Sequence, residues 1–236
     1  MLAQHLRKQF RRCRHGVVFL SFQQRRLVVR QHRLKPGARV FNIGAHQGVV
    51  ALMLARIVER EGCVIAVEPE PHNVRIAERN KLLNGICHMR VLHAAVAEHS
   101  GQLPIRCGLD LSQTDRFRDW DQLGVAALQL DELSGKYGLP DVLFIDVDGF
   151  ECQVLRGGRN TINQVPDCFV EVHVGAGLER EGGTLAEVLS FFPTESYELW
   201  IASEEHRQFV PFDASSFLLD SRFFLVAVSR APSTSC

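Results

Sequence analysis

The amino-acid sequence lacks a net charge, a long apolar run and any paired-cysteine motif. Its 236 residues include 27 basic and 27 acidic side chains, a balance that argues against general binding to nucleic acids or membrane surfaces. No apolar run approaches the ~20 residues of a membrane span, and the charged N-terminal region has no signal-peptide pattern. The seven cysteines include no C-x-x-C pair, which is typical of reduced thiols and predicts a cytoplasmic protein without a zinc site.

Two phosphate-binding motifs are also missing. Neither the G-x-G-x-x-G of dinucleotide-binding folds nor a phosphate loop with Lys-Ser or Lys-Thr occurs around Gly44 and Gly48. The pattern present is a buried strand, a glycine turn, a helix and a second strand that ends at Glu68. In a parallel sheet this order builds a nucleoside site. The free N–H groups at the helix start and an acid that can bind two ribose hydroxyls lie at the same edge of the sheet. It favours S-adenosyl-L-methionine (S-adenosylmethionine), which has a ribose but no phosphate, although the glycines alone also suit an ordinary strand-to-helix turn.

The N-terminal region differs from the rest of the chain in its charge. Residues 1–35 contain ten basic side chains and no acidic one. They are predicted to form a helix at 2–14 and a hairpin of strands at 16–22 and 26–31. The turn Lys35-Pro36-Gly37 marks the predicted boundary with a domain of residues 36–230, and residues 231–236 form a tail. We expect the basic extension to be solvated, with an anionic partner or a homodimer contact as alternatives.

Strands and helices alternate through the predicted domain. The expected strands cover 40–43, 64–67, 90–92, 96–98, 103–106, 141–147, 168–172, 197–201 and 223–228, and 125–130 is a further apolar segment. The expected helices cover 49–60, 71–83, 131–137, 151–155 and 184–192. The run 141–147 is apolar, as a central strand covered on both faces should be. The last two strands are expected to form an antiparallel hairpin at the sheet edge, which is more typical of methyltransferases than of nicotinamide dehydrogenases.

Three polar side chains end neighbouring buried strands. Asp146 ends the central strand, whereas Glu171 and His173 end the next strand and share one side of it. Open α/β sheets bind ligands at this carboxyl edge. Because a hydroxyl acceptor must lose a proton, we predict His173 as the general base, oriented by Asp146 or Glu171. The favoured prediction contains no metal. A structural role for His173, or a magnesium or manganese site that also uses Asp148, is an alternative.

Several segments, in this order and spacing, resemble the FkbM family of S-adenosylmethionine-dependent methyltransferases. They are Asn42–Gly48, Val67–Pro71, Asn80 with Asn84, Leu130–Leu133, Phe144–Glu151, Val154–Gly157 and Val170–His173. The resemblance implies an α/β class I methyltransferase (Rossmann-like) fold, mostly parallel with an antiparallel C-terminal strand and helices on both faces. It also implies S-adenosylmethionine as donor and O-methylation of a small molecule or sugar. The residues implied for cofactor binding are Asn42, Gly44, Ala45, His46, Gly48, Glu68, Pro69 and Asp146.

Four positions depart from the residues usual in that family. The chain has Asn42 for Asp, His46 for Asn, Phe144 for Lys and Asp148 for Glu. Asn42 brings no negative charge near a cationic ligand, and Phe144 removes a candidate cation. These two changes keep open a non-catalytic binding protein with this fold. A nucleotide-dependent oxidoreductase is a separate alternative. The acceptor pocket is expected in the loops 107–124 and 203–221, whose sequences do not identify the acceptor.

Overall fold

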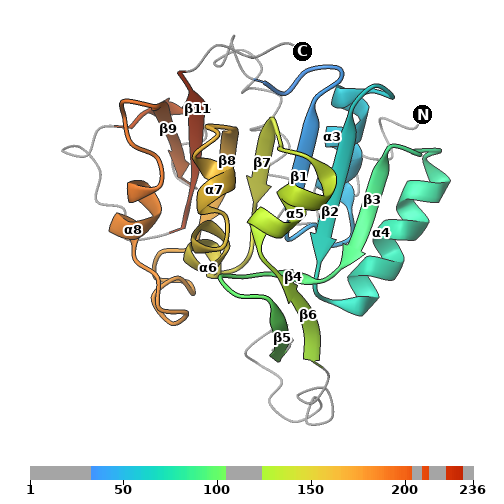
Figure 1. Ribbon diagram of the computed structural model, residues 1–236, viewed down its shortest axis with the longest axis horizontal. Helices are drawn as coiled ribbons and strands as arrows, with labels where there is room; N and C mark the ends of the chain where they lie inside the picture. Colours follow the sequence, from blue (N-terminus) through green and yellow to red (C-terminus); the bar gives the residue numbers. More distant parts are fainter. Residues whose placement is uncertain (1–32, 105–123, 204–208, 213–221, 231–236) are drawn as a thin grey trace.

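The chain folds around an eight-stranded sheet, and the computed structural model describes residues 33–104, 124–203, 209–212 and 222–230. The strands are β1 (Arg39–Ile43), β2 (Cys63–Glu68), β3 (Met89–His93), β7 (Val142–Ile145), β8 (Asp167–Val172), β9 (Tyr197–Ser203), β10 (Val210–Pro211) and β11 (Phe223–Ser229). Their order in the sheet is β3-β2-β1-β7-β8-β11-β9-β10 (Figure 1). The five strands from β3 to β8 are parallel, so their carboxyl ends share one edge.

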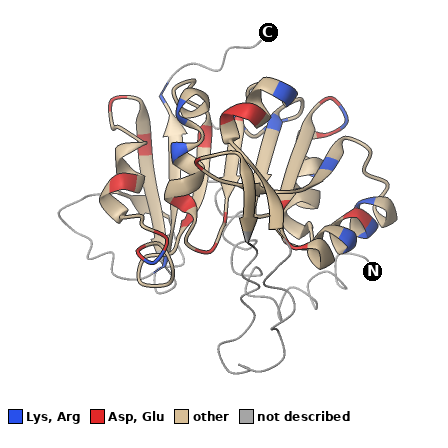
Figure 2. Cartoon of the chain, turned by 60° about the horizontal axis from the view of Figure 1, so that its bottom comes forward, with Lys and Arg blue, Asp and Glu red and all other residues tan. Residues whose placement is uncertain are grey.

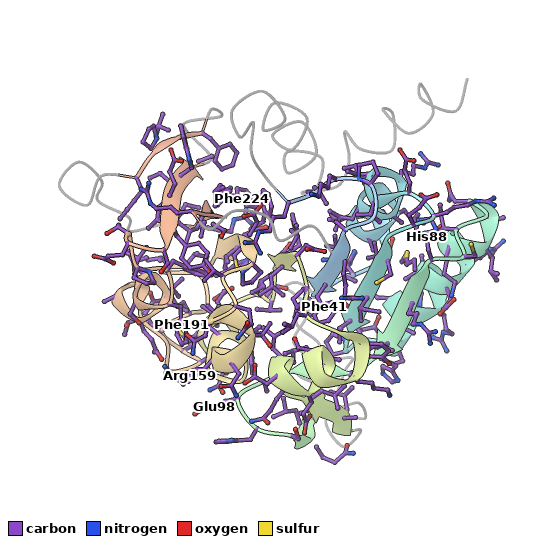
Figure 3. All side chains as sticks on the ribbon, turned by 45° about the horizontal axis from the view of Figure 1, so that its top comes forward. Phe41, His88, Glu98, Arg159, Phe191 and Phe224 are labelled. Atoms are coloured by element: carbon purple, nitrogen blue, oxygen red, sulfur yellow. The ribbon has the colours of Figure 1, made fainter. Side chains whose placement is uncertain are left out.

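Helices cover both faces of this sheet. They are α3 (Val49–Val58), α4 (Pro71–Leu83), α5 (Leu130–Tyr137), α6 (Glu151–Arg156), α7 (Arg159–Ile162) and α8 (Leu185–Ser190). Buried residues of α3 pack with Val40 on one face, and buried residues of α5 to α8 pack with Phe41 on the other. Successive residues of β1 thus enter two separate cores, as side chains alternating along a strand require. Figure 3 shows Phe41 at the centre of the molecule, and Arg159 beside Phe191, with its guanidinium 4.9 Å from the ring centre.

Local sequence signals explain the start of α4, whose bounds agree with the predicted helix 71–83. Glu70 is its N-cap, and the Glu70 carboxylate accepts hydrogen bonds from the backbone N–H groups of His72 (2.9 Å) and Asn73 (2.6 Å). Pro71 occupies the first helical position, where a missing N–H costs nothing. This cap fixes the chain immediately after β2 and therefore fixes the loop that carries Glu68 and Pro69.

A second, three-stranded sheet follows β3. It contains β4 (Ala95–Val96), β5 (Gly101–Pro104) and β6 (Gly124–Leu128), in the order β4-β6-β5. Because β3 ends at His93 and β4 begins at Ala95, this sheet starts at the carboxyl edge of the main sheet, and Figure 1 shows it extending away from there. The predicted strands at 96–98 and 103–106 correspond to β4 and β5, which begin earlier. Most of the predicted acceptor loop 107–124 lies outside the described residues.

The C-terminal strands agree with the prediction, and the structure adds their order in the sheet. We expected β9 and β11 to form an antiparallel hairpin at the sheet edge, and they do pair antiparallel. Within the sheet, β11 lies between β8 and β9, and only the two-residue β10 lies beyond β9. The reason is burial: β11 has the pattern Phe-Phe-Leu-Val-Ala-Val, and most of its residues are buried. A strand this apolar gains more between two neighbours than at an exposed edge.

The described part of the chain begins two residues before the predicted boundary at residue 35, which stays a prediction. Leu34 is buried in the core on the α3 face, and the backbone N–H of Arg33 donates to Asp167 at 2.5 Å. Both residues, which the sequence analysis assigned to the extension, therefore pack on the domain. The predicted helix 2–14, the hairpin 16–31 and the tail 231–236 lie outside the described residues, as does the suggested dimer contact.

Charges are mixed over the described part of the chain. Figure 2 shows basic and acidic residues interspersed, with both signs on α4. Among the helices that the structure describes, none is long and apolar enough to cross a membrane. The four described cysteines, Cys63, Cys87, Cys152 and Cys168, are free thiols. Cys152 and Cys168 are buried in the core beside α5 to α8, which agrees with their apolar sequence neighbours.

Candidate active site at the carboxyl edge of the sheet

The glycine turn after β1 is held against both neighbouring strands. The N–H groups of Gly44 and Ala45 donate to the carbonyl of Val67 on β2, each at 2.9 Å. Gly44 has a φ of 79°, and a Cβ added there would lie 1.7 Å from the carbonyl oxygen of Asp146. Only glycine can therefore occupy this position, because any side chain would collide with the end of β7. The turn and Asp146 are consequently parts of one site.

Gly48 closes the same turn and begins α3. It has a φ of 78° and is the N-cap residue of the helix. A Cβ added at Gly48 would lie 2.9 Å from the Cβ of Ala77 on α4, so glycine also permits α3 and α4 to approach. His46, at a φ of 48°, is the one non-glycine residue of this turn in the left-handed region. Such strain is often found where backbone is shaped for a ligand.

Glu68 connects the end of β2 to this turn. Its carboxylate accepts the N–H of His46 at 2.7 Å and the N–H of Glu70 at 2.9 Å, and Asn73 Nδ2 lies 3.4 Å away. Glu68 is only 5% exposed, and this burial raises its pKa even though the two backbone N–H groups act in the opposite direction. The acid is therefore fixed in place, with acceptor positions left for ligand hydroxyls, since a carboxylate offers about four.

Asn42 and Pro69 complete the predicted donor side. Asn42 is 1% exposed, and its side-chain oxygen has no hydrogen-bond partner among the described residues. A buried acceptor without a donor is costly, so a ligand N–H or O–H would suit it. The carbonyl of Pro69 contacts His93 Nε2 at 3.0 Å, which holds the loop after Glu68. The structure thus offers a fixed acid, an orphaned acceptor and a glycine turn, features that fit a nucleoside-containing cofactor.

Phe144 pairs with Asn42 in the parallel β1–β7 ladder and is an apolar residue of the core. It is 3% exposed and stacks on Phe169 of β8, with ring centres 6.2 Å apart. Both rings belong to the core on the α3 face. The side chain at this position therefore contributes packing between β7 and β8.

The three residues predicted to end neighbouring strands do lie together. One ligand atom each from Asp146, Glu171 and His173 can be chosen so that all three lie within 4.8 Å of one another. His173 Nε2 lies 3.9 Å from Glu171 Oε1. The pairing of Ile145 with Val170 in the parallel β7–β8 ladder explains this, because Asp146 and Glu171 directly follow that pair and lie side by side. Glu171 and His173 are buried, and Asp146 is partly buried.

Glu151, rather than Asp146 or Glu171, orients His173. Its Oε1 lies 2.7 Å from His173 Nδ1 and also accepts the N–H of Gly149 at 3.0 Å. Glu151 is completely buried, and its Oε2 has no hydrogen-bond partner among the described residues. The sequence analysis did not assign Glu151 to the site. The signal it missed is spacing, because Glu151 falls on the same face of α6 as the buried Val154 and Leu155.

Two further charged groups border His173. Arg222 Nη1 lies 3.2 Å from Glu171 Oε1, and Arg222 directly precedes β11, whose Phe223 pairs with Val172. Asp148, with a φ of 48°, places its exposed carboxylate 3.3 Å from His173 Nε2. Sequence reasoning did not identify Arg222, because its place opposite His173 depends on the insertion of β11.

This concentration of charge shifts the protonation of the two buried groups. Burial acts to lower the pKa of His173, but hydrogen bonds to Asp148 and Glu151 and the charges of Glu151 and Glu171 outweigh it and raise that pKa to about 10. Burial and the charge of Asp146 raise the pKa of Glu171 to about 8, although His173 and Arg222 act to lower it. These surroundings favour the protonated imidazole of His173, which is unfavourable for a general base.

Comparison with known proteins places this geometry in a family. The "Methyltransferase FkbM domain" family matches residues 42–203. Hexuronic acid methyltransferase AglP of Haloferax volcanii is 28% identical over 138 residues, which cover 57% of this chain and 54% of that protein. The chain thus spans about half the length of this curated relative.

Solved structures show the same fold. The methyltransferase FkbM from Methylobacillus flagellatus KT is similar over 80% of this chain and 43% of its own, with a TM-score of 0.53 at 15% identity. An O-methyltransferase from Thermotoga maritima, dependent on S-adenosylmethionine, is similar over 94% of this chain and 67% of its own, with a TM-score of 0.50 at 12% identity. The fold is that of class I methyltransferases, and the predicted fold class is confirmed. From the match over residues 42–203, the chain belongs to the FkbM methyltransferase domain family.

Proposed function

We propose that this protein is an S-adenosylmethionine-dependent O-methyltransferase that acts on a hydroxyl group of a sugar or similar small molecule. One observation carries the proposal: the backbone of Gly44 packs against Asp146, which joins the donor turn to the cluster of Asp146, Glu171 and His173. Family membership supports the reaction class. The hexuronic acid methyltransferase of Haloferax volcanii supports a sugar-type acceptor.

The donor side of the site is proposed to consist of Asn42, Gly44, Ala45, His46, Gly48, Glu68, Pro69 and Asp146. The fixed carboxylate of Glu68 would accept the two ribose hydroxyls, and the unpartnered oxygen of Asn42 would accept a ligand donor. S-adenosylmethionine supplies a methyl group on a sulfonium, and its transfer to a hydroxyl leaves the electron pair on sulfur and releases the hydroxyl proton. The protein's part is to orient donor and acceptor and to take charge of that proton.

The acceptor side is proposed to be the cluster of Asp146, Glu171 and His173. The three side chains end two adjacent strands beside the glycine turn, where a hydroxyl could approach the donor. The role of His173 as general base stays a prediction, and it requires the imidazole to lose the proton that its neighbours favour. A cytoplasmic location belongs to the same proposal and is consistent with the free thiols of the described cysteines.

Calorimetric titration of the full chain tests the donor, with S-adenosylmethionine, S-adenosylhomocysteine and NAD as ligands. We expect saturable binding of both adenosyl ligands and none of NAD. Transfer of a labelled methyl group to a panel of free sugars and hexuronic acids tests the acceptor. Saturable binding of NAD alone would instead support the oxidoreductase alternative. Binding of the adenosyl ligands with no transfer to any hydroxyl would support a binding protein with this fold.

A further inference from the structure

His173 presents one ring nitrogen to a carboxylate partner and the other to two more carboxylates. Nδ1 is held by the buried Glu151 at 2.7 Å, which places the proton on that nitrogen when the ring is neutral. Nε2 then carries the lone pair, and it lies 3.3 Å from Asp148 and 3.9 Å from Glu171. A histidine that binds a metal ion usually has this surrounding: one ring nitrogen donates to a carboxylate, and the other faces the ion together with oxygen ligands.

The distances in front of Nε2 suit one small cation. Ligands about 2.1 Å from a shared ion lie about 3.0 Å apart when adjacent and about 4.2 Å apart when opposite. The 3.9 Å between His173 Nε2 and Glu171 Oε1 falls in this range. The candidate ligand atoms of all three residues, Asp146 included, lie within 4.8 Å of one another.

We propose that Asp146, Glu171 and His173 bind a divalent cation, with Glu151 as the positioning residue behind His173. Two carboxylates favour magnesium or manganese, and the imidazole ligand shifts the preference toward manganese. Three protein ligands leave coordination positions open on a six-coordinate ion. The buried Glu151 holds the imidazole of His173 in one orientation. A metal ion requires such a fixed orientation from a histidine ligand.

Charge balance agrees with this assignment. Four carboxylates surround His173, those of Asp146, Asp148, Glu151 and Glu171. One cation, the guanidinium of Arg222, lies 3.2 Å from Glu171. A dication would share the Glu171 carboxylate with Arg222 or displace it. Arg222 is therefore expected to compete with the ion, and replacing it with glutamine should tighten cation binding.

The cation's role in catalysis rests on the proposed methyl transfer. The ion would lower the pKa of an acceptor hydroxyl held in an open coordination position, and the proton of that hydroxyl would pass to water beside the exposed Asp148 carboxylate. This assigns His173 a ligand role, in place of the general base predicted from the sequence.

Manganese binding to the full chain tests the site without any turnover. After treatment with a chelator, the protein is titrated with Mn²⁺ and the signal of free Mn²⁺ is followed by electron paramagnetic resonance. We expect one Mn²⁺ per chain, bound more tightly than Mg²⁺. Asp146→Asn, Glu171→Gln and His173→Gln should each abolish stoichiometric binding, and Glu151→Gln should weaken it by about 10- to 100-fold. Glu179→Gln, which changes an exposed acid of the adjacent loop, should bind as the native protein does.

A second readout covers variants that fail to fold. Saturating Mn²⁺ should raise the melting temperature of the native protein, because the ion binds the folded state. No stoichiometric Mn²⁺ and no melting shift in a native protein that still binds S-adenosylmethionine would overturn the cation site and leave the proposed function intact. Full methyl transfer in excess chelator would likewise overturn it and favour His173 as base. Failure of the proposed function would appear separately, as absence of adenosyl-ligand binding.

Discussion

Replacing Glu68 with glutamine tests the contact on which the proposed cofactor site depends. In the native protein, Glu68 Oε2 accepts the N–H of His46 and Oε1 accepts the N–H of Glu70. Glutamine keeps one of these oxygens and turns an NH₂ group toward the other backbone donor. It also removes the charge that would strengthen hydrogen bonds from ribose hydroxyls.

The expected loss of affinity follows from these contacts. A hydrogen bond to a charged group contributes about 1.5–3 kcal/mol, so the Kd for S-adenosylmethionine should rise by about 10- to 150-fold. The loss of folding stability should be smaller. The raised pKa of Glu68 shows that the buried carboxylate is held at a cost, which the neutral amide avoids and which offsets part of the lost backbone hydrogen bond.

Calorimetric titration beside thermal melting separates the two effects. The matched control is Asp131→Asn, because Asp131 also accepts two backbone N–H groups, from Asn160 at 3.2 Å and Thr161 at 2.8 Å. Asp131 joins α5 to α7 and takes no part in the proposed site. The control should lower the melting temperature without changing the Kd. An unchanged Kd in a folded Glu68→Gln protein would refute the ribose contact and place the nucleoside elsewhere.

Three further predictions concern the turn, the pH dependence and the N-terminal region. Gly44→Ala should lose several kcal/mol of stability and measurable cofactor binding, because its Cβ would collide with Asp146, whereas Gly135→Ala in α5, with open space around it, should raise the melting temperature slightly. Because the pKa of Glu68 is raised, acidification should weaken cofactor binding at a higher pH than it would if Glu68 had the pKa of an exposed glutamate. Titrations across pH should show this loss in the native protein and not in Glu68→Gln. A shortened chain that starts at residue 32 should still bind S-adenosylmethionine, and loss of binding there would make the basic region part of the domain or of a subunit contact.

Local and periodic signals in the sequence were sufficient for most of the main sheet. The apolar runs at β1, β2, β7 and β8 are buried on both faces, so composition alone identified them as inner parallel strands. The helix α4 was predicted with its observed bounds, because Pro71 at its start and Asn84-Gly85 after its end are strong local signals. The short α7 (Arg159–Ile162) was missed, because the helix makes only one turn after Gly157-Gly158 and has no periodic pattern.

The site was only partly predictable for a physical reason. Strand order and period-two geometry brought Asp146, Glu171 and His173 to one edge, as expected from the sequence. The partner of His173 instead depends on the turn between β7 and α6. Asp148 there has a φ of 48°, and a Cβ on Gly149 would lie 2.6 Å from the backbone of Gly177. Such close packing of two turns sets where Glu151 points, and no single-sequence pattern encodes it.

The buried pair of Glu151 and His173 also bears on whether the chain is a working enzyme. If only the fold mattered, an apolar side chain at position 151 would extend the buried stripe of Val154 and Leu155 at lower cost. A fully buried carboxylate with one oxygen unpartnered is expensive, and a cluster of further acids beside it adds repulsion. Asp146 N–H meanwhile donates to the Ile43 carbonyl at 3.0 Å, which ties this costly cluster to the donor turn. This combination of a buried carboxylate, neighbouring acids and a link to the donor turn supports the proposed methyl transfer over a purely structural role for the cluster.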